Sequence, residues 1–157
     1  MRIGLISDTH GRLRPQVYDA FDGVDLILHA GDVGPIDIIT DLETVAPVHA
    51  VMGNTDSPAL MPRVQDEVRL ELEGHAVVVV HGHRLGAPTA ALLRAAYPDA
   101  NVIVYGHTHR QRVDNVDGCL VVNPGAAGAA RFGLKPSVTV LELAAGEAAK
   151  AEVVELT

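Results

Sequence analysis

The sequence has little of what nucleic-acid-binding proteins need. Its 157 residues include no Trp, three Tyr and two Phe, so it lacks the aromatic side chains on which single-stranded bases stack. Twelve Lys and Arg against twenty Asp and Glu give a net charge of −8, which disfavours a polyanionic partner. We therefore expect no stable nucleic-acid complex. A phosphate-bearing substrate would have to be held by something other than a basic surface, such as a divalent cation.

Cysteine and long apolar runs are also scarce. Cys119 is the single cysteine, so it can form neither an internal disulfide nor a thiolate metal cluster, and we expect it to be a small buried side chain. The apolar residues 3–6 are too few for a signal-peptide core or a membrane span. We expect a soluble, cytoplasmic protein with no membrane partner, in which residues 1–157 form one domain. Whether it forms a homo-oligomer stays open.

The sequence does contain short apolar runs that alternate with longer periodic segments. Segments 15–21, 36–45 and 88–97 predict helices, each with Pro at or near its first turn. This alternation indicates an α/β fold. From residue 113 onward, short strands and turns predict a second, more antiparallel sheet, and 68–72 with 76–80 predict a hairpin. The predicted strands are 2–6, 25–28, 48–52, 68–72, 76–80, 102–105, 119–122, 137–143 and 151–156.

Side chains that can bind metal or phosphate follow five of these strands. Taken singly, each cluster is an ordinary turn or helix cap. The carboxyl ends of strands in an open α/β sheet meet at one edge, however, so the clusters should converge there. They are Asp8-Thr9-His10, Gly31-Asp32, Gly53-Asn54-Thr55-Asp56, His81-Gly82-His83 and Gly106-His107-Thr108-His109.

The residue types in these clusters favour particular metals. Carboxylate, imidazole and amide ligands without thiolate suit Mn²⁺, Fe, Zn²⁺ or Ni²⁺ better than Mg²⁺ or Ca²⁺. Seven such side chains are too many for one ion that keeps an open coordination position. They fit two divalent ions about 3.5–4 Å apart that share a carboxylate. We expect Mn²⁺ to be the preferred ion.

The ordered blocks D-x-H, G-D, G-N-x-D, H and G-H-x-H resemble those of the calcineurin-like metallophosphoesterase superfamily. The compact length, His81-Gly82-His83 and Asn123-Pro124-Gly125 are similar to its small single-domain phosphodiesterase branch. The resemblance implies a four-layer α/β/β/α sandwich of two mixed sheets flanked by helices. It also implies that Asp32 bridges two metals with both carboxylate oxygens. The other implied ligands are Asp8, His10 and His109 for the first metal, and Asn54, His81 and His107 for the second.

By this resemblance the chain would be a metal-dependent phosphoric ester hydrolase. The expected reaction is hydrolysis of a small phosphodiester by in-line attack of a metal-bridging hydroxide. Two alternatives stay open. The same site would also serve a phosphomonoesterase, and a retromer subunit that resembles this fold is a non-catalytic protein-interaction scaffold.

One position departs from the family pattern. Many members carry a His after the Asn of the third block, and it assists the leaving group, whereas this chain has Thr55. A hydroxyl cannot act as an acid near neutral pH, so that role has no carrier here. Asp56 is then predicted to hydrogen-bond a loop. His29 is predicted to be a buried hydrogen-bonding side chain that orients a ligand.

Three further residues are candidates for contact with the substrate. His83 is either a proton donor or substrate contact, or a side chain that stabilises its loop. Arg131 is either a bidentate phosphate ligand or a surface residue. Asn54 is a metal ligand that would also touch the substrate.

Overall fold

The structure is a computed structural model that describes residues 1–129 and 131–157. It contains two mixed β-sheets, with strand orders β11-β10-β1-β2-β3-β4 and β5-β6-β7-β9-β8. The strands of the first sheet are β1 (Arg2–Ile6), β2 (Leu26–His29), β3 (Val48–Val51), β4 (Val64–Gln65), β10 (Ser137–Glu142) and β11 (Lys150–Glu155). Those of the second are β5 (Glu67–Leu72), β6 (His75–Val80), β7 (Val102–Val104), β8 (Arg112–Val116) and β9 (Cys119–Asn123).

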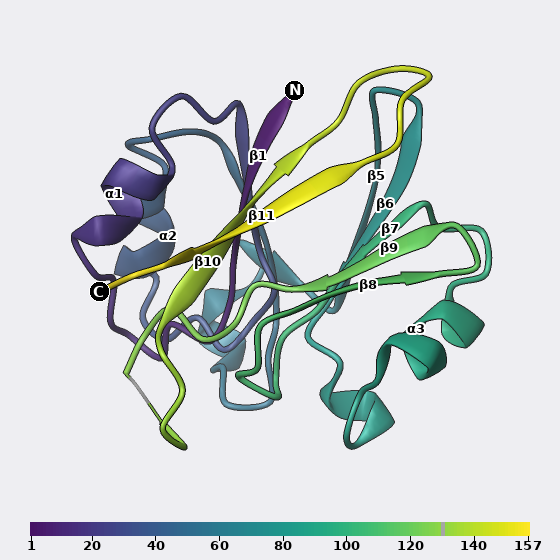
Figure 1. Cartoon of the computed structure of the whole chain (residues 1–157). Helices are drawn as coiled ribbons and strands as arrows, with labels where there is room; N and C mark the ends of the chain where they lie inside the picture. Colours follow the sequence, from purple (N-terminus) through teal and green to yellow (C-terminus); the bar gives the residue numbers. More distant parts are fainter. Residues whose placement is uncertain (130) are drawn as a thin grey trace.

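Helices cover the outer face of each sheet. Figure 1 shows α1 (Gln16–Ala20) and α2 (Asp37–Leu42) beside the first sheet, and α3 (Ala90–Ala96) beside the second. Two 3₁₀ turns, η1 (Pro58–Leu60) and η2 (His83–Leu85), lie in loops. The four-layer α/β/β/α arrangement expected from the sequence is therefore confirmed, although each helix is shorter than predicted. Among the described residues, no helix has the length and apolar content that a membrane span requires.

Alternating side chains along the strands build the core in layers. Between the sheets, Ile3 and Leu5 of β1 belong to the same buried cluster as Val77 and Val79 of β6. A second cluster lies under α1 and α2, and a third lies under α3 and includes the buried Cys119. The sandwich is thus held together by three apolar layers, with Cys119 buried as predicted.

The C-terminal strands correct one prediction. β10 and β11 form an antiparallel pair, but they join the first sheet beside β1 and not a separate second sheet. β10 lies between β1 and β11 and is buried from Ser137 to Leu141, as expected of a strand in a sheet that is covered on both faces. The predicted hairpin is confirmed, because β5 and β6 pair antiparallel in the second sheet.

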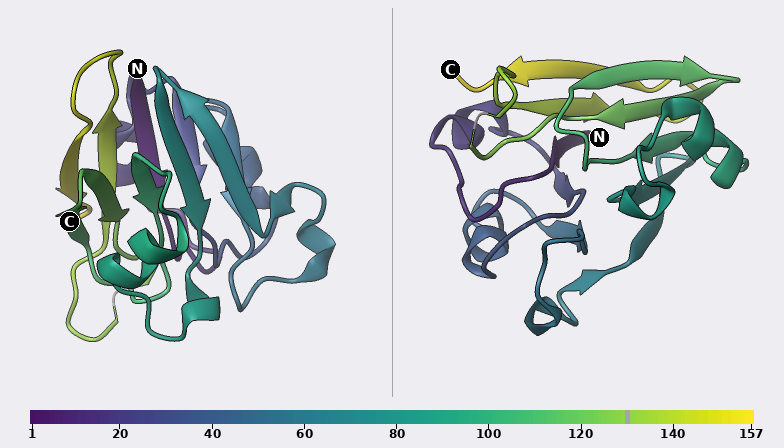
Figure 2. Two further views of the ribbon diagram at one scale, coloured as in Figure 1. Left: turned by 90° about the vertical axis from the view of Figure 1, so that its right-hand side faces the viewer. Right: turned by 90° about the horizontal axis from the view of Figure 1, so that it is seen from below.

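The strand directions bring the polar clusters to one edge. β1, β2 and β3 are parallel in the first sheet, and β6 is parallel to β7 in the second. Figure 2 shows the two sheets stacked face to face. Backbone hydrogen bonds then join the loops, from Asp8 N–H to Gly31 O (2.9 Å), from His10 N–H to Asp32 O (2.9 Å) and from Gly106 N–H to His81 O (3.1 Å).

Candidate metal centre

The loops at this edge hold their polar residues in an uncommon backbone conformation. Eight non-glycine residues in the described chain have positive φ, and five of them are predicted ligands. L-residues rarely adopt this region, although Asp and His enter it more readily than most. The five are Asp8 (φ 53°), His10 (47°), Asp32 (53°), His107 (72°) and His109 (63°). Such outliers cluster at functional sites.

Asp8 is completely buried and presents one free oxygen to the site. Its Oδ2 accepts hydrogen bonds from Ser7 Oγ (2.6 Å) and from the His107 N–H (3.1 Å). Within the described part of the chain, Oδ1 has no hydrogen-bond partner. It lies 3.3, 3.8 and 3.9 Å from the Nε2 atoms of His109, His10 and His81. A buried carboxylate oxygen without a donor is costly, and a cation among these nitrogens would satisfy it.

The two carboxylate oxygens of Asp32 also have different partners. Oδ1 accepts the Thr55 N–H at 3.0 Å, whereas Oδ2 lies 3.3 Å from His81 Nε2 and 3.6 Å from His10 Nε2. The Oδ2 atom therefore faces both histidines. Burial alone would raise the pKa of Asp32, but hydrogen bonds with His81 and the Thr55 N–H lower it well below its usual range.

His81 is oriented for metal binding by its backbone partner. Its Nδ1 donates to Ala30 O at 2.8 Å, which leaves Nε2 to face the site, 3.1 Å from Asn54 Oδ1. Metal-binding histidines usually donate their other ring N–H in this way. Burial alone would lower the pKa of His81, but the neighbouring carboxylates of Asp32 and Asp8 raise it above the usual value.

Two sets of side chains could each hold a cation, since their ligand atoms lie within 4.8 Å of one another. They are Asp8, His10 and His109, and Asp8, Asp32 and His81. His107 lies outside both sets, with its ring centroid 5.2 Å from that of His81. Burial, and secondarily His81, lowers the pKa of His107 and favours its neutral, metal-binding form. The structure therefore brings all seven predicted ligands to one edge, in a donor set that fits divalent metal binding.

Several supporting residues escaped the sequence analysis. Ser7 donates to Asp8, and Asn123 Nδ2 donates to Gly106 O (3.2 Å) and Thr108 Oγ1 (3.0 Å) inside the G-H-x-H loop. Gly106 must lack a Cβ, because one placed there would lie 2.0 Å from Ser7 Oγ. The Asn123-Pro124-Gly125 motif supported the family resemblance, but it did not predict these hydrogen bonds of Asn123.

His29 acts on the backbone around the site. Its Nδ1 accepts the Gly31 N–H at 3.2 Å, so the neutral ring carries its proton on Nε2, which donates to Thr9 Oγ1 at 3.0 Å. Thr9 Oγ1 in turn donates to Val33 O at 2.7 Å. Burial lowers the pKa of His29 to about 4, although the nearby carboxylates of Asp8, Asp56 and Asp32 favour its cation. Among the described residues, the hydrogen bonds of His29 thus join the loops after β1 and β2 and do not involve a predicted ligand side chain.

Asp56 occupies the loop position expected of it. Its carboxylate accepts the N–H groups of Gly53 (2.9 Å) and Gly34 (3.1 Å), which joins the loops after β2 and β3. Gly53 itself has no room for a side chain, because a Cβ there would lie 2.0 Å from Asp32 Oδ1. Thr55 is exposed and contributes its backbone N–H to Asp32.

The remaining candidates lie around the centre. The His83 ring lies 5.3 Å from that of His81 and 6.3 Å from that of His107, and its buried Nδ1 has no partner among the described residues. Arg131 is exposed on the loop between β9 and β10. Next to it, Phe132 is 77% exposed, with its ring 6.1 Å from that of His109. Phe132 was not predicted, because one exposed aromatic residue has no signature in the sequence.

Comparison with known proteins places this geometry in context. A family model described as the calcineurin-like phosphoesterase superfamily domain matches residues 1–146. A probable metallophosphoesterase from Methanothermobacter thermautotrophicus is 37% identical over 98% of this chain and 92% of its own. A solved archaeal phosphodiesterase is 26% identical, with a TM-score of 0.83 over 99% of this chain and 100% of that chain. Vps29 from Entamoeba histolytica, solved with zinc, is 24% identical, with a TM-score of 0.80 over 99% of both chains.

Proposed function

The chain belongs to the calcineurin-like phosphoesterase superfamily, and on that premise we propose that it is a two-metal phosphodiesterase acting on small phosphate diesters. The observation that carries the proposal is the free Oδ1 of Asp8, buried among three imidazole nitrogens. An anionic oxygen in such a place is best explained as a cation ligand. The chain is accordingly a metal-dependent phosphoester hydrolase in its broad class, and the preference for diesters is the finer part of the proposal.

We assign one ion to each side of Asp32. Its Oδ2 faces His10 on one side and His81 on the other, which suits a bridging oxygen. The first ion would take Asp8, His10 and His109, and the second would take Asn54, His81 and His107. When bound, two such ions activate a water and neutralise charge on the phosphate oxygens. Mn²⁺ is the proposed ion, because the donors are carboxylate, imidazole and amide without thiolate.

The protein's own groups fix the ligands and shape the substrate side. Ser7 holds Asp8, the Thr55 N–H holds Asp32 and Ala30 O holds His81, so hydrogen bonds to protein groups orient these ligands. We propose that Asn54 and His83 contact the substrate, since Asn54 is exposed and the Nδ1 of His83 is unpaired among the described residues. We assign no role to Arg131.

Two rival functions differ from this proposal in measurable ways. A phosphomonoesterase would use the same ions but would prefer a substrate with one organic group. A scaffold of this fold would need no metal, yet all seven positions here retain side chains able to bind one. The similarity to an archaeal phosphodiesterase supports the diester.

The test is metal analysis combined with hydrolysis of bis(p-nitrophenyl) phosphate and p-nitrophenyl phosphate. We expect bound divalent metal, loss of hydrolysis on chelation, recovery with Mn²⁺ at least as good as with other ions, and faster turnover of the diester. Full activity in a metal-free preparation would refute the mechanism. Faster turnover of the monoester would favour the phosphomonoesterase, and absence of both metal and hydrolysis would favour the scaffold.

A further inference from the structure

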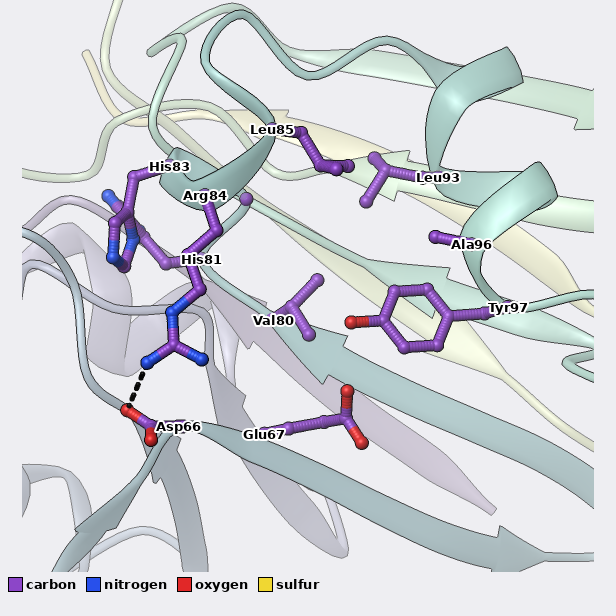
Figure 3. A pocket seen from close by; sticks show the side chains of 11 residues that line it. Asp66, Glu67, Val80, His81, His83, Arg84, Leu85, Leu93, Ala96 and Tyr97 are labelled. Carbon is purple, nitrogen blue, oxygen red and sulfur yellow. Dashed lines mark ion pairs between the residues drawn. The ribbon is translucent and has the colours of Figure 1, made fainter.

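A pocket lies beside the metal centre, on the α3 side of the second sheet. Its volume is about 100 Å³. In Figure 3 the labelled side chains surround it, with His81 and His83 at one end and Tyr97 at the other. Val80 and Leu93 form a buried apolar floor, whereas Leu85 on η2 is exposed despite its size.

The pocket begins where the substrate would lie. His81 lines it and also faces Asp32 and Asn54. His83 lines it and has its ring 6.3 Å from that of His107. A phosphate bound at the metal centre would therefore lie next to the end of the pocket that His81 and His83 form.

The charged side chains of the pocket wall, Arg84, Asp66 and Glu67, each have an ion-pair partner. Arg84 forms an ion pair with Asp66 at 3.2 Å, and the dashed line in Figure 3 marks this pair. Glu67 forms an ion pair with Arg69. Among the described residues these charged side chains are therefore paired, and the unpaired Nδ1 of His83 lies at the end of the pocket nearest the metal centre. An uncharged group fits the rest of the pocket best, because the paired charges there would not compensate a buried ion.

The volume limits the size of that group. An apolar cavity of about 150 Å³ is enough to bind benzene, so a pocket of about 100 Å³ with an exposed rim suits a short alkyl chain or part of one ring. A nucleoside, with base and sugar together, is too large.

We propose that this pocket binds one organic substituent of the phosphodiester, and that it selects compact, uncharged, apolar groups. This inference rests on the proposed function, because only a phosphate bound at the metals would bring an ester arm beside His81 and His83, which line the pocket. A phosphomonoester retains at most one arm, and inorganic phosphate has none.

The test uses Ala96→Phe, which fills the pocket from an exposed position on α3. Ala95→Phe is the matched control, since Ala95 is exposed on the same helix and does not line the pocket. Binding of inorganic phosphate, dimethyl phosphate and methyl phenyl phosphate to the Mn²⁺-loaded proteins would be measured by calorimetry. Wild type should bind methyl phenyl phosphate about 10- to 100-fold more tightly than dimethyl phosphate, as expected for burying part of a ring.

Ala96→Phe should abolish that advantage and leave phosphate binding unchanged, and Ala95→Phe should behave as wild type. Equal affinity of wild type for the two diesters, or an advantage that survives in Ala96→Phe, would overturn the pocket assignment while phosphate binding still supports the metal centre. Failure of all three ligands to bind would overturn the proposed function, and the pocket assignment with it.

Discussion

Replacing Ser7 with Ala should weaken metal binding as well as the fold. Ser7 Oγ donates to Asp8 Oδ2 at 2.6 Å, and both side chains are fully buried. Without this donor the carboxylate keeps only the His107 N–H. Asp8 then gains freedom to turn its free oxygen away from the three imidazoles, so the ligand is less well placed for a cation.

Two independent magnitudes agree on the size of this effect. A hydrogen bond to a charged group contributes about 1.5–3 kcal/mol. Loss of a group that orients a metal ligand typically costs about 10- to 100-fold in affinity, which corresponds to roughly 1.4–2.8 kcal/mol. Competition with a coloured chelator would measure the affinity, and urea unfolding of the metal-free protein would measure stability.

Ser137→Ala is the matched control. Ser137 is equally buried, but its Oγ donates to Pro124 O at 2.7 Å and not to a carboxylate. It should lose stability comparably, by about 1 kcal/mol, and keep its metal affinity. If Ser7→Ala bound metal as tightly as Ser137→Ala does, the argument that Ser7 orients Asp8 would be wrong.

Two further perturbations test the centre and its surroundings. Asp32→Ala should lower metal content and turnover at least about 10-fold, because Oδ2 faces His10 and His81. The control is His49→Ala, at an exposed position of β3, which should change neither metal content in elemental analysis nor turnover in rate assays. Equal behaviour of the two variants would show that the site is placed wrongly. The buried His29 has a pKa of about 4, against about 6.5 in the unfolded chain. As the pH falls, the unfolded state therefore takes up a proton on this ring before the folded state does. The stability of the fold then decreases between about pH 6.5 and pH 4, by roughly 3 kcal/mol in total. His29→Gln should remove that part of the pH dependence in chelator-treated protein, and parallel unfolding curves for the two proteins from pH 7 to 4 would contradict it.

The strands and the convergence of the ligands could be predicted because both follow from local pattern. A short apolar run bounded by turn residues marks a buried strand, as in β1, which matches its predicted bounds of 2–6 and is buried from Ile3 to Ile6. Parallel strands end at the same edge, so Asp8 and Asp32 had to lie near each other whatever the details of the loops. Their free oxygens indeed face the same histidine, His81.

The remaining features depend on contacts between distant segments. β10 pairs with β1, with Ile3 opposite Leu141, although most of the chain separates the two strands. No local sequence pattern encodes this pairing. The closeness of Gly53 to Asp32 likewise appears only when two loops meet. The pocket beside His83 requires the packing of α3 against the second sheet, so the sequence could name His83 but not what surrounds it.

The strained backbone at the ligands suggests how metal binding and folding are related. A residue in a sparsely populated region costs about 1–3 kcal/mol, and five ligand residues here have positive φ. Loops that had to fold around a cation would recover such a cost only with the metal present. Here backbone hydrogen bonds, such as Asp8 N–H to Gly31 O, join the loops to one another. The loops extend from strands whose apolar side chains are buried between the two sheets. The loop hydrogen bonds and the buried sheets therefore help to offset the cost of the strained backbone, so that metal coordination does not offset it alone.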